Sequence, residues 1–157
     1  MIVLVMGVAG VGKTTIGELL VRALGWRFID ADDYHPPENI AKMKAGIPLE
    51  DADRWPWLSH LNRELKRYDD AVIACSALKE RYRERLLQGI ARYRIVYLQG
   101  APELIRSRMA TRTHRYMPAL LLDSQLAALE PPTDAIAIDV AAPPEQSVAA
   151  ILAQLPK

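Results

Sequence analysis

The stretch that most constrains this chain lies at residues 7–15 and reads GVAGVGKTT. It matches the Gly-x-x-x-x-Gly-Lys-Thr pattern of a phosphate-binding loop, whose backbone N–H groups surround a polyphosphate. An apolar run precedes the loop at residues 2–6, and apolar residues at helical spacing follow it at residues 16–24. A strand, a glycine-rich loop and a helix N-terminus in this order predict a binding site for a nucleoside triphosphate.

Each part of this loop has an expected task in holding ATP. The glycines allow backbone conformations that bring N–H groups close to phosphate oxygens. Lys13 can reach the β- and γ-phosphates, and the hydroxyl of Thr14 can bind Mg²⁺. The expected ATP-binding residues of the loop are Gly7, Val8, Ala9, Gly10, Val11, Gly12, Lys13, Thr14 and Thr15.

A cluster of carboxylates follows the second predicted strand, at residues 26–30. Asp30, Asp32 and Asp33 come at its carboxyl end, which is the edge where parallel α/β sheets bind their ligands. One aspartate there could hold Mg²⁺ through water, and another could accept a proton from a substrate hydroxyl. The structural alternative is that these side chains only cap the next helix or lie in solvent.

The order of the remaining patterns predicts an α/β fold. Short apolar segments that alternate with helical patterns lie at residues 2–6, 26–30, 71–75, 95–98 and 135–139. Wholly apolar strands of this kind are typical of a parallel sheet that is covered on both faces. We therefore predict one domain over residues 1–157, built on a five-stranded parallel sheet with helices on both faces. Two insertions at its ligand edge are expected: acceptor-binding helices at residues 33–68 and an arginine-bearing lid at residues 110–128.

Composition argues against several other classes of protein. The net charge of +1 gives no overall attraction to nucleic acid or to an anionic membrane. The basic cluster at residues 92–115 also lacks the interleaved aromatic residues of a single-strand binder. Cys75 is the only cysteine, so no intramolecular disulfide can form and a reducing compartment is favoured. No apolar run has transmembrane length and the first strand begins at residue 2, so we expect a cytoplasmic protein without a leader peptide.

Taken in order, the motifs resemble those of the small gluconokinases, which are relatives of the shikimate and adenylate kinases. The resemblance covers nearly the whole chain. Besides the phosphate loop, it is carried by DAD (30–32), HP (35–36), NI (39–40), KM (42–43), GIPL (46–49), DRxPWL (53–58), CSALK (75–79) and MPxxLLxSQ (117–125). It implies a P-loop kinase fold like that of the nucleoside monophosphate kinases, with transfer of the γ-phosphoryl group of ATP to the 6-hydroxyl of D-gluconate.

The same resemblance implies roles for individual residues. Lys13 and Thr14 would handle the triphosphate and Mg²⁺, while Asp30 would support the metal through water. Arginines of the lid would neutralise charge on the moving phosphoryl group, a task that suits the guanidinium fork. The implied catalytic residues are Lys13, Asp32 and Arg112. The implied substrate-binding residues are Asp32, His35, Arg54, Lys79 and Arg115, and Arg108 and Arg112 join the ATP-binding set. Residues 139–144 would face the adenine, and a homodimer is expected for the family.

The lid departs from the family pattern at one point. The family commonly places His directly before an aromatic residue and Met. Here Arg115 precedes Tyr116, and His114 is displaced by one position. We therefore expect Arg115 to take over a contact in the site, and the role of His114 stays open.

Two alternatives remain at this point. Within the same fold, the acceptor could be shikimate, a nucleoside monophosphate or another hydroxy acid, and only the resemblance at DRxPWL argues against these. In a different class, the chain could be a nucleotide-dependent switch. It has no NKxD base-reading element, and paired aspartates with an arginine lid suit rapid phosphoryl transfer better. Dependence of ATP consumption on an added sugar acid would distinguish the two classes.

Overall fold

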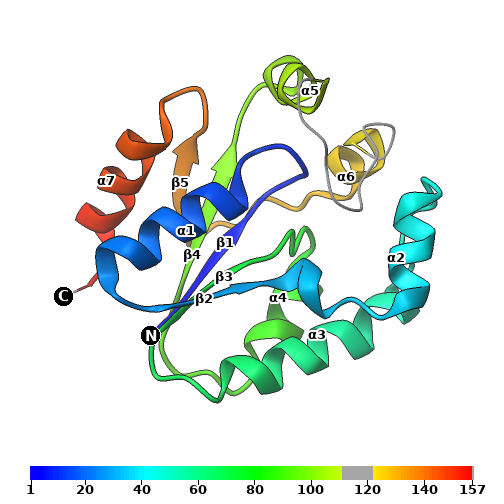
Figure 1. Ribbon diagram of the computed structural model, residues 1–157, viewed down its shortest axis with the longest axis horizontal. Coiled ribbons are helices and arrows are strands. Elements are labelled where there is room, and N and C mark those ends of the chain that lie inside the picture. The colour runs from blue at the N-terminus through cyan, green and yellow to red at the C-terminus, as the bar shows by residue number, and fades with distance from the viewer. Residues whose placement is uncertain (111–121, 157) are drawn as a thin grey trace.

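Five strands and seven α-helices make up the part of the chain that our computed structural model describes, residues 1–110 and 122–156 (Figure 1). The strands are β1 (Ile2–Met6), β2 (Arg27–Asp30), β3 (Ala71–Ala74), β4 (Tyr93–Gln99) and β5 (Ile136–Asp139). The helices are α1 (Lys13–Leu24), α2 (Pro37–Lys44), α3 (Asp51–Leu65), α4 (Glu80–Leu87), α5 (Pro102–Ala110), α6 (Leu122–Ala128) and α7 (Pro144–Gln154), and a 3₁₀ turn, η1, spans Ala31–Tyr34.

The strands form one parallel sheet in the order β2-β3-β1-β4-β5, which confirms the predicted sheet. The central strand, β1, pairs with β3 on one side and with β4 on the other. Consecutive strands β1 and β2 are therefore separated by β3. Because all strands run the same way, the segments that follow β1, β2 and β3 meet at one edge of the sheet.

Alternate side chains of β1 point into two different cores. Val3 and Val5 belong to the core beneath α1 and α7, whereas Leu4 and Met6 belong to the core beneath α3 and α4. Figure 1 shows the two pairs of helices on opposite faces of the sheet. All of β1 is buried, as its continuous apolar run predicted.

The helix boundaries follow the local sequence signals. Gly25 ends α1 in the left-handed conformation, with φ of 72°, and its N–H donates to the carbonyl of Val21 at 2.7 Å. Glycine is well suited to end a helix in this conformation. The N-cap of α3 is Glu50, which forms a reciprocal capping box with Asp53.

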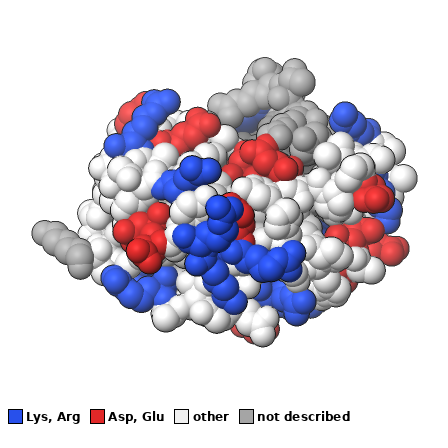
Figure 2. Space-filling model, turned by 60° about the horizontal axis from the view of Figure 1, so that its bottom comes forward, with Lys and Arg blue, Asp and Glu red and all other residues white. Residues whose placement is uncertain are grey.

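The described surface carries charges of both signs. In the view of Figure 2, Lys and Arg side chains gather near the middle of the face, and Asp and Glu side chains border them. This mixture agrees with the small net charge and shows no uniformly basic face in that view. Within residues 1–110 and 122–156, no helix is both long and apolar enough to cross a lipid bilayer.

Candidate active site

A cavity of about 530 Å³ lies at the carboxyl edge of the sheet. Its walls come from the phosphate loop, from the segments that follow β2 and β3, from the first turns of α3 and α4, and from α6. Eleven of the residues singled out from the sequence line it: Ala9, Gly10, Gly12, Lys13, Thr14, Thr15, Asp30, Asp32, His35, Arg54 and Lys79. The predicted nucleotide and acceptor residues are thus brought together in one space, although they come from segments up to 70 positions apart.

The phosphate loop ends at Gly12, which has φ of 94° and is the N-cap of α1. A side chain is disfavoured in this left-handed conformation, so glycine is required for the loop to enter the helix here. The Nζ of Lys13 donates to the carbonyls of Gly7 and Val8 at 2.9 and 3.0 Å. Burial lowers the pKa of Lys13, and the nearby carboxylates of Asp32 and Asp30 oppose that shift. Lys13 is therefore folded back over its own loop at the floor of the cavity.

Thr14 and Asp30 form a pair of oxygen donors beside this loop. The hydroxyl of Thr14 donates to Oδ2 of Asp30 at 3.3 Å, and Oδ1 of Asp30 accepts the N–H of Asp32 at 3.0 Å. Asp30 does cap η1, as the structural alternative held, but only one of its oxygens is used for capping. Hard oxygen ligands of this kind fit Mg²⁺, which keeps several waters and needs only one or two protein ligands beside substrate phosphates. Among the described residues, no three His, Cys, Asp or Glu side chains gather into a denser metal site.

Asp32 lies within the turn η1, and His35 is the residue that ends this turn. The Nε2 of His35 is 3.8 Å from Oδ1 of Asp32, whose side chain is 55% exposed. The His35 ring is buried and stacks on Trp57, with ring centroids 3.9 Å apart and planes 17° from parallel. Burial, together with the charge of Arg54, lowers the pKa of His35 to about 4, so the ring is neutral near pH 7. Trp57 is fixed in turn, because its Nε1 donates to the carbonyl of Ala31 at 2.8 Å.

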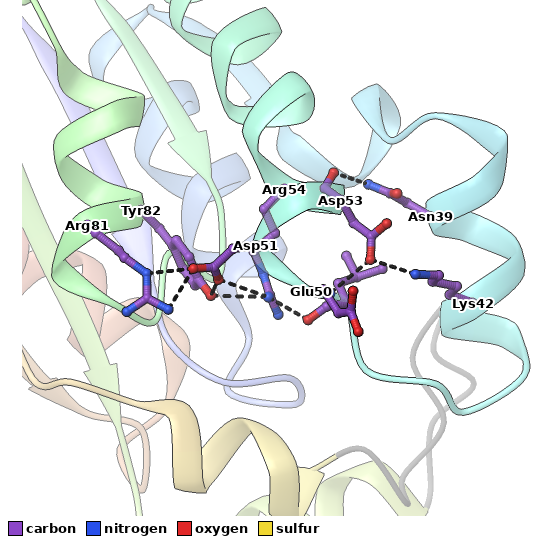
Figure 3. Close-up of polar contacts among 9 residues, drawn as sticks. Asn39, Lys42, Glu50, Asp51, Asp53, Arg54, Arg81 and Tyr82 are labelled. Carbon is purple, nitrogen blue, oxygen red and sulfur yellow. Dashed lines mark hydrogen bonds and ion pairs between the residues drawn. The ribbon is translucent and has the colours of Figure 1, made fainter.

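Arg54 is held by a network that joins α3 to α4 (Figure 3). Its Nη1 donates to the carbonyl of Leu49 at 2.6 Å and to the hydroxyl of Tyr82 at 3.1 Å, and the guanidinium carbon lies 4.8 Å from the centre of the Tyr82 ring. The Tyr82 hydroxyl donates to Oδ1 of Asp51 at 2.5 Å. Arg81 completes the network with an ion pair to Oδ2 of Asp51 at 2.8 Å.

Three basic and two acidic residues make up this wall. Arg54, Arg81 and Lys79 line the cavity there beside Asp51 and Glu50, and Asp51 pairs with two of the three. The hydrogen bond from Tyr82, followed by that from Arg81, lowers the pKa of Asp51 and keeps it ionised. Among the described residues, the Lys79 ammonium makes no hydrogen bond or ion pair. A small anion with several hydroxyls is the kind of ligand that such a wall can bind.

The turn that carries Lys79 is fixed from behind by Arg83. Arg83 is 6% exposed and donates to the carbonyls of Ala77 and Glu130 at 2.8 and 2.9 Å. Ala77 has φ of 43°, an unusual conformation for a residue with a side chain. The N–H of Glu130 donates in turn to the carbonyl of Leu78 at 2.8 Å. The buried guanidinium therefore holds a strained turn against the segment that follows α6.

Two further contacts lie near the predicted lid, one in its last helix and one just before it. Gln125 of α6 accepts the N–H of Ala9 at 2.7 Å, which joins α6 to the phosphate loop. Arg108 donates to the carbonyl of Val140 at 2.6 Å, so it lies against the segment after β5 rather than among the residues that line the cavity. The other predicted lid residues, Arg112, His114 and Arg115, lie outside the described residues.

Several residues of the cavity were not singled out from the sequence for a role. Asp51, Arg81 and Tyr82 act across two helices, so no local spacing marks them. Gln125 also lines the cavity, and Asn39 does not line it but contacts His35. Both lie within motifs that carry the family resemblance, and that was the signal from which they could have been found. Cys75, by contrast, is buried as predicted, and burial raises the pKa of its thiol to about 12, which fits a core residue.

Comparison with known proteins agrees with this arrangement. The shikimate kinase family model matches residues 9–152. A probable gluconokinase of Xenopus tropicalis is 44% identical over 162 residues, covering 89% of this chain and 85% of the relative. The crystal structure of a gluconokinase from Sinorhizobium meliloti 1021 is 43% identical with a TM-score of 0.88, over 96% of this chain and 89% of that one.

Shikimate kinase of Aquifex aeolicus, over 98% of this chain and 94% of its own, has a TM-score of 0.60 and only 19% identity, which is a likeness of fold. The expected P-loop kinase fold is therefore confirmed. The gluconokinases have a much higher identity to this chain, and the match extends over most of both chains. This chain belongs to the gluconokinase family.

Proposed function

We propose that this chain is an ATP-dependent gluconate kinase that forms 6-phosphogluconate and ADP. The observation that carries the proposal is the single cavity that joins a phosphate-binding loop to a basic wall suited to a sugar acid. Membership of the gluconokinase family supports the same acceptor. The 6-hydroxyl is proposed as the phosphorylated group because it is the end of gluconate farthest from the carboxylate that the basic wall would hold.

The phosphate loop and Lys13 would bind the triphosphate. The carbonyls of Gly7 and Val8 now hold the Lys13 ammonium, and this contact keeps the cation next to the position that β- and γ-phosphate oxygens would take. Mg²⁺, when bound, would offset charge on those oxygens, and Thr14 with Asp30, through water, would hold it. Arg108 and residues 139–144 would border the adenine, which the contact between Arg108 and Val140 supports.

Asp32 would act on the acceptor hydroxyl. Asp32 lines the cavity, and its charge is close enough to influence the pKa of Lys13. In an in-line transfer, the hydroxyl oxygen forms the new bond to the γ-phosphorus while the bond from that phosphorus to the bridging oxygen of ADP breaks. The hydroxyl proton passes to Asp32, and no covalent enzyme intermediate is needed.

The carboxylate of gluconate would bind at Arg54 and Lys79, with Arg81 contributing charge. Arg54 uses Nη1 for its contacts within the protein, which leaves the rest of its guanidinium for a ligand in the cavity. His35 would form part of the wall beside Trp57 rather than a charged contact, because it is buried and neutral. Arg112 and Arg115 are proposed to approach the transferred phosphoryl group from the lid.

The test is a coupled ADP-release assay with Mg-ATP and four conditions: gluconate, shikimate, AMP and no acceptor. We expect ADP release with gluconate alone. Release with shikimate would instead favour the activity named by the matched family model. Equal release in all four conditions would refute an acceptor kinase and leave a plain ATPase on the same fold.

A further inference from the structure

Asn39 contacts two acceptors with one nitrogen. It lies on α2 and is 2% exposed. Its Nδ2 is 3.0 Å from the backbone carbonyl of Asp53 and 3.2 Å from Nδ1 of His35. The pair of contacts joins the acceptor-binding helices α2 and α3 to the imidazole beside Asp32.

These contacts determine the protonation of the imidazole. A backbone carbonyl can only accept a hydrogen bond, so the amide NH₂ of Asn39, and not its oxygen, must face Asp53. The same nitrogen then has one hydrogen left, which it donates to Nδ1 of His35. Nδ1 must therefore carry a lone pair, and the single proton of the neutral ring lies on Nε2.

The protonated Nε2 lies near the carboxylate that we assign to the acceptor hydroxyl. Nε2 is 3.8 Å from Oδ1 of Asp32, whose side chain is 55% exposed, and shortening this distance by under about 1 Å would make a full hydrogen bond. The His35 ring cannot turn freely, because it is stacked on Trp57 and Trp57 is itself bonded to Ala31.

We propose that Asn39 and His35 are positioning residues that present an Nε2–H to Oδ1 of Asp32, the carboxylate that we assign to the acceptor hydroxyl. A neutral donor suits this task, because it orients the carboxylate without adding a positive charge that would weaken it as a base. The inference rests on the proposed kinase function for its catalytic part. Its structural part, the proton position on His35, holds without any substrate.

The first experiment reads the proton position by nitrogen-15 NMR of histidine-labelled protein at pH 7, without ligands. The chain has three histidines, and His35→Gln assigns the signal of interest by its loss. We expect the neutral Nε2–H tautomer. In Asn39→Asp, a carboxylate faces Nδ1 and accepts rather than donates, so the tautomer should change to Nδ1–H. A wild-type Nδ1–H tautomer or a charged ring would overturn the proposal.

The second experiment separates positioning from packing by kinetics. His35→Gln places an amide N–H near the position of Nε2, whereas His35→Phe keeps an aromatic ring on Trp57 and removes every donor. We expect kcat with gluconate to fall about tenfold or more in His35→Phe and to recover to within about threefold of the wild type in His35→Gln. KM for ATP should stay unchanged in both. Equal kcat in His35→Phe and wild type, or equal losses in both variants, would refute the role.

A matched control comes from His60, which is exposed on the same helix as Trp57 and does not line the cavity. His60→Phe and His60→Gln should leave kcat and both KM values unchanged.

The outcomes of these experiments also separate the proposed kinase function from the proposed role of Asn39 and His35. Absence of gluconate-dependent ADP release in the wild type refutes the kinase function, whereas the NMR result stands or falls without substrate. If Asn39→Asp does not fold, the comparison of His35→Gln with His35→Phe still decides the question.

Discussion

Asp30 and Asp32 lie two positions apart but use their carboxylates differently. Asp30 is engaged on both oxygens, by Thr14 and by the backbone of η1, whereas the Asp32 side chain extends into the cavity toward His35. A carboxylate paired with Thr14 beside the phosphate loop suits support of a metal, and one that lines the cavity beside His35 suits proton transfer. The division of tasks between the two aspartates therefore follows from their places in the site.

Asp32→Asn is the substitution that tests this division. The amide keeps the shape of the side chain but cannot accept the hydroxyl proton, so we expect kcat to fall by about 10²- to 10⁴-fold. ATP affinity, measured by titration without acceptor, should change little. Asp33→Asn is the matched control, since Asp33 is exposed and does not line the cavity, and it should retain kcat. Near-normal turnover in Asp32→Asn would remove Asp32 from the reaction.

Residues whose contacts are local could be predicted from the sequence. Lys13 bonds to carbonyls five and six positions away, inside one recognisable motif. The pair of Asp51 and Tyr82 is separated by 31 positions, and nothing in either helix marks it. Such contacts depend on how two helices are placed on the sheet, which short-range patterns do not specify.

On the scale of elements, α3 and α4 are joined by the network around Arg54 and by the turn that Arg83 holds. The region predicted to hold the acceptor-binding helices, residues 33–68, does contain α3. Nothing in the sequence marks Arg83 for burial, because a charged residue on a helix is usually exposed. Its burial depends on hydrogen bonds to the carbonyls of Ala77 and Glu130, which come from two other segments of the chain.

Tyr82→Phe tests the network around Arg54. It removes the hydroxyl that accepts from Arg54 and donates to Asp51, and it keeps the ring. Hydrogen bonds to charged groups contribute about 1.5–3 kcal/mol, so kcat/KM for gluconate should fall about tenfold or more, while KM for ATP is unchanged. Gluconamide, which has no carboxylate, should lose much less.

An equal decrease in kcat/KM for gluconate and gluconamide would mean that the network does not recognise the carboxylate of the acceptor. Tyr68→Phe is the control for this experiment. Its hydroxyl also bonds a carboxylate, that of Glu64, at 3.5 Å, but it does not line the cavity. Both acceptors should react with this variant as with the wild type.

Arg83→Met tests the buried support of the turn. The substitution keeps much of the side-chain volume but leaves the carbonyls of Ala77 and Glu130 without their donor. We expect the free energy of unfolding to fall by about 2–4 kcal/mol, measured by urea denaturation. Arg85→Met on the same helix is exposed and should change it by under about 0.5 kcal/mol. Similar values for the two variants would contradict a structural role for Arg83.

Considered as a whole, the molecule brings distant segments to one edge through the order of its strands. The sequence predicted a parallel five-stranded sheet but not the order β2-β3-β1-β4-β5. That order depends on which crossovers pack best on each face, so it is a property of the assembled cores rather than of any one strand. The sequence predicted that the motifs would come together in one site, but it did not predict the shape of the cavity.

The pH dependence of stability is also a property of the whole fold. The pKa of His35 is about 4 in the folded protein and near its ordinary value of 6.5 in the unfolded chain. Between these values the unfolded chain binds more protons, so stability must fall as the pH decreases through this window. From pH 7 to pH 5 the expected loss from His35 is about 2 kcal/mol.

Urea denaturation of the wild type and of His35→Gln at both pH values measures this contribution. The variant should lose less stability than the wild type by about that amount, because glutamine does not titrate. Equal losses in the two proteins would mean that His35 accepts a proton without cost in the folded state.

The contacts of Ala9 with Gln125 and of Val140 with Arg108 have a consequence for engineering. The first fixes α6, the last helix of the predicted lid, to the phosphate loop, and the second fixes the end of α5, just before the lid, to the segment after β5. A graft that replaced only residues 111–121 with the corresponding segment of a relative would keep both contacts. It would exchange the predicted lid arginines, Arg112 and Arg115, while the cavity wall from α3 and α4 is inherited unchanged.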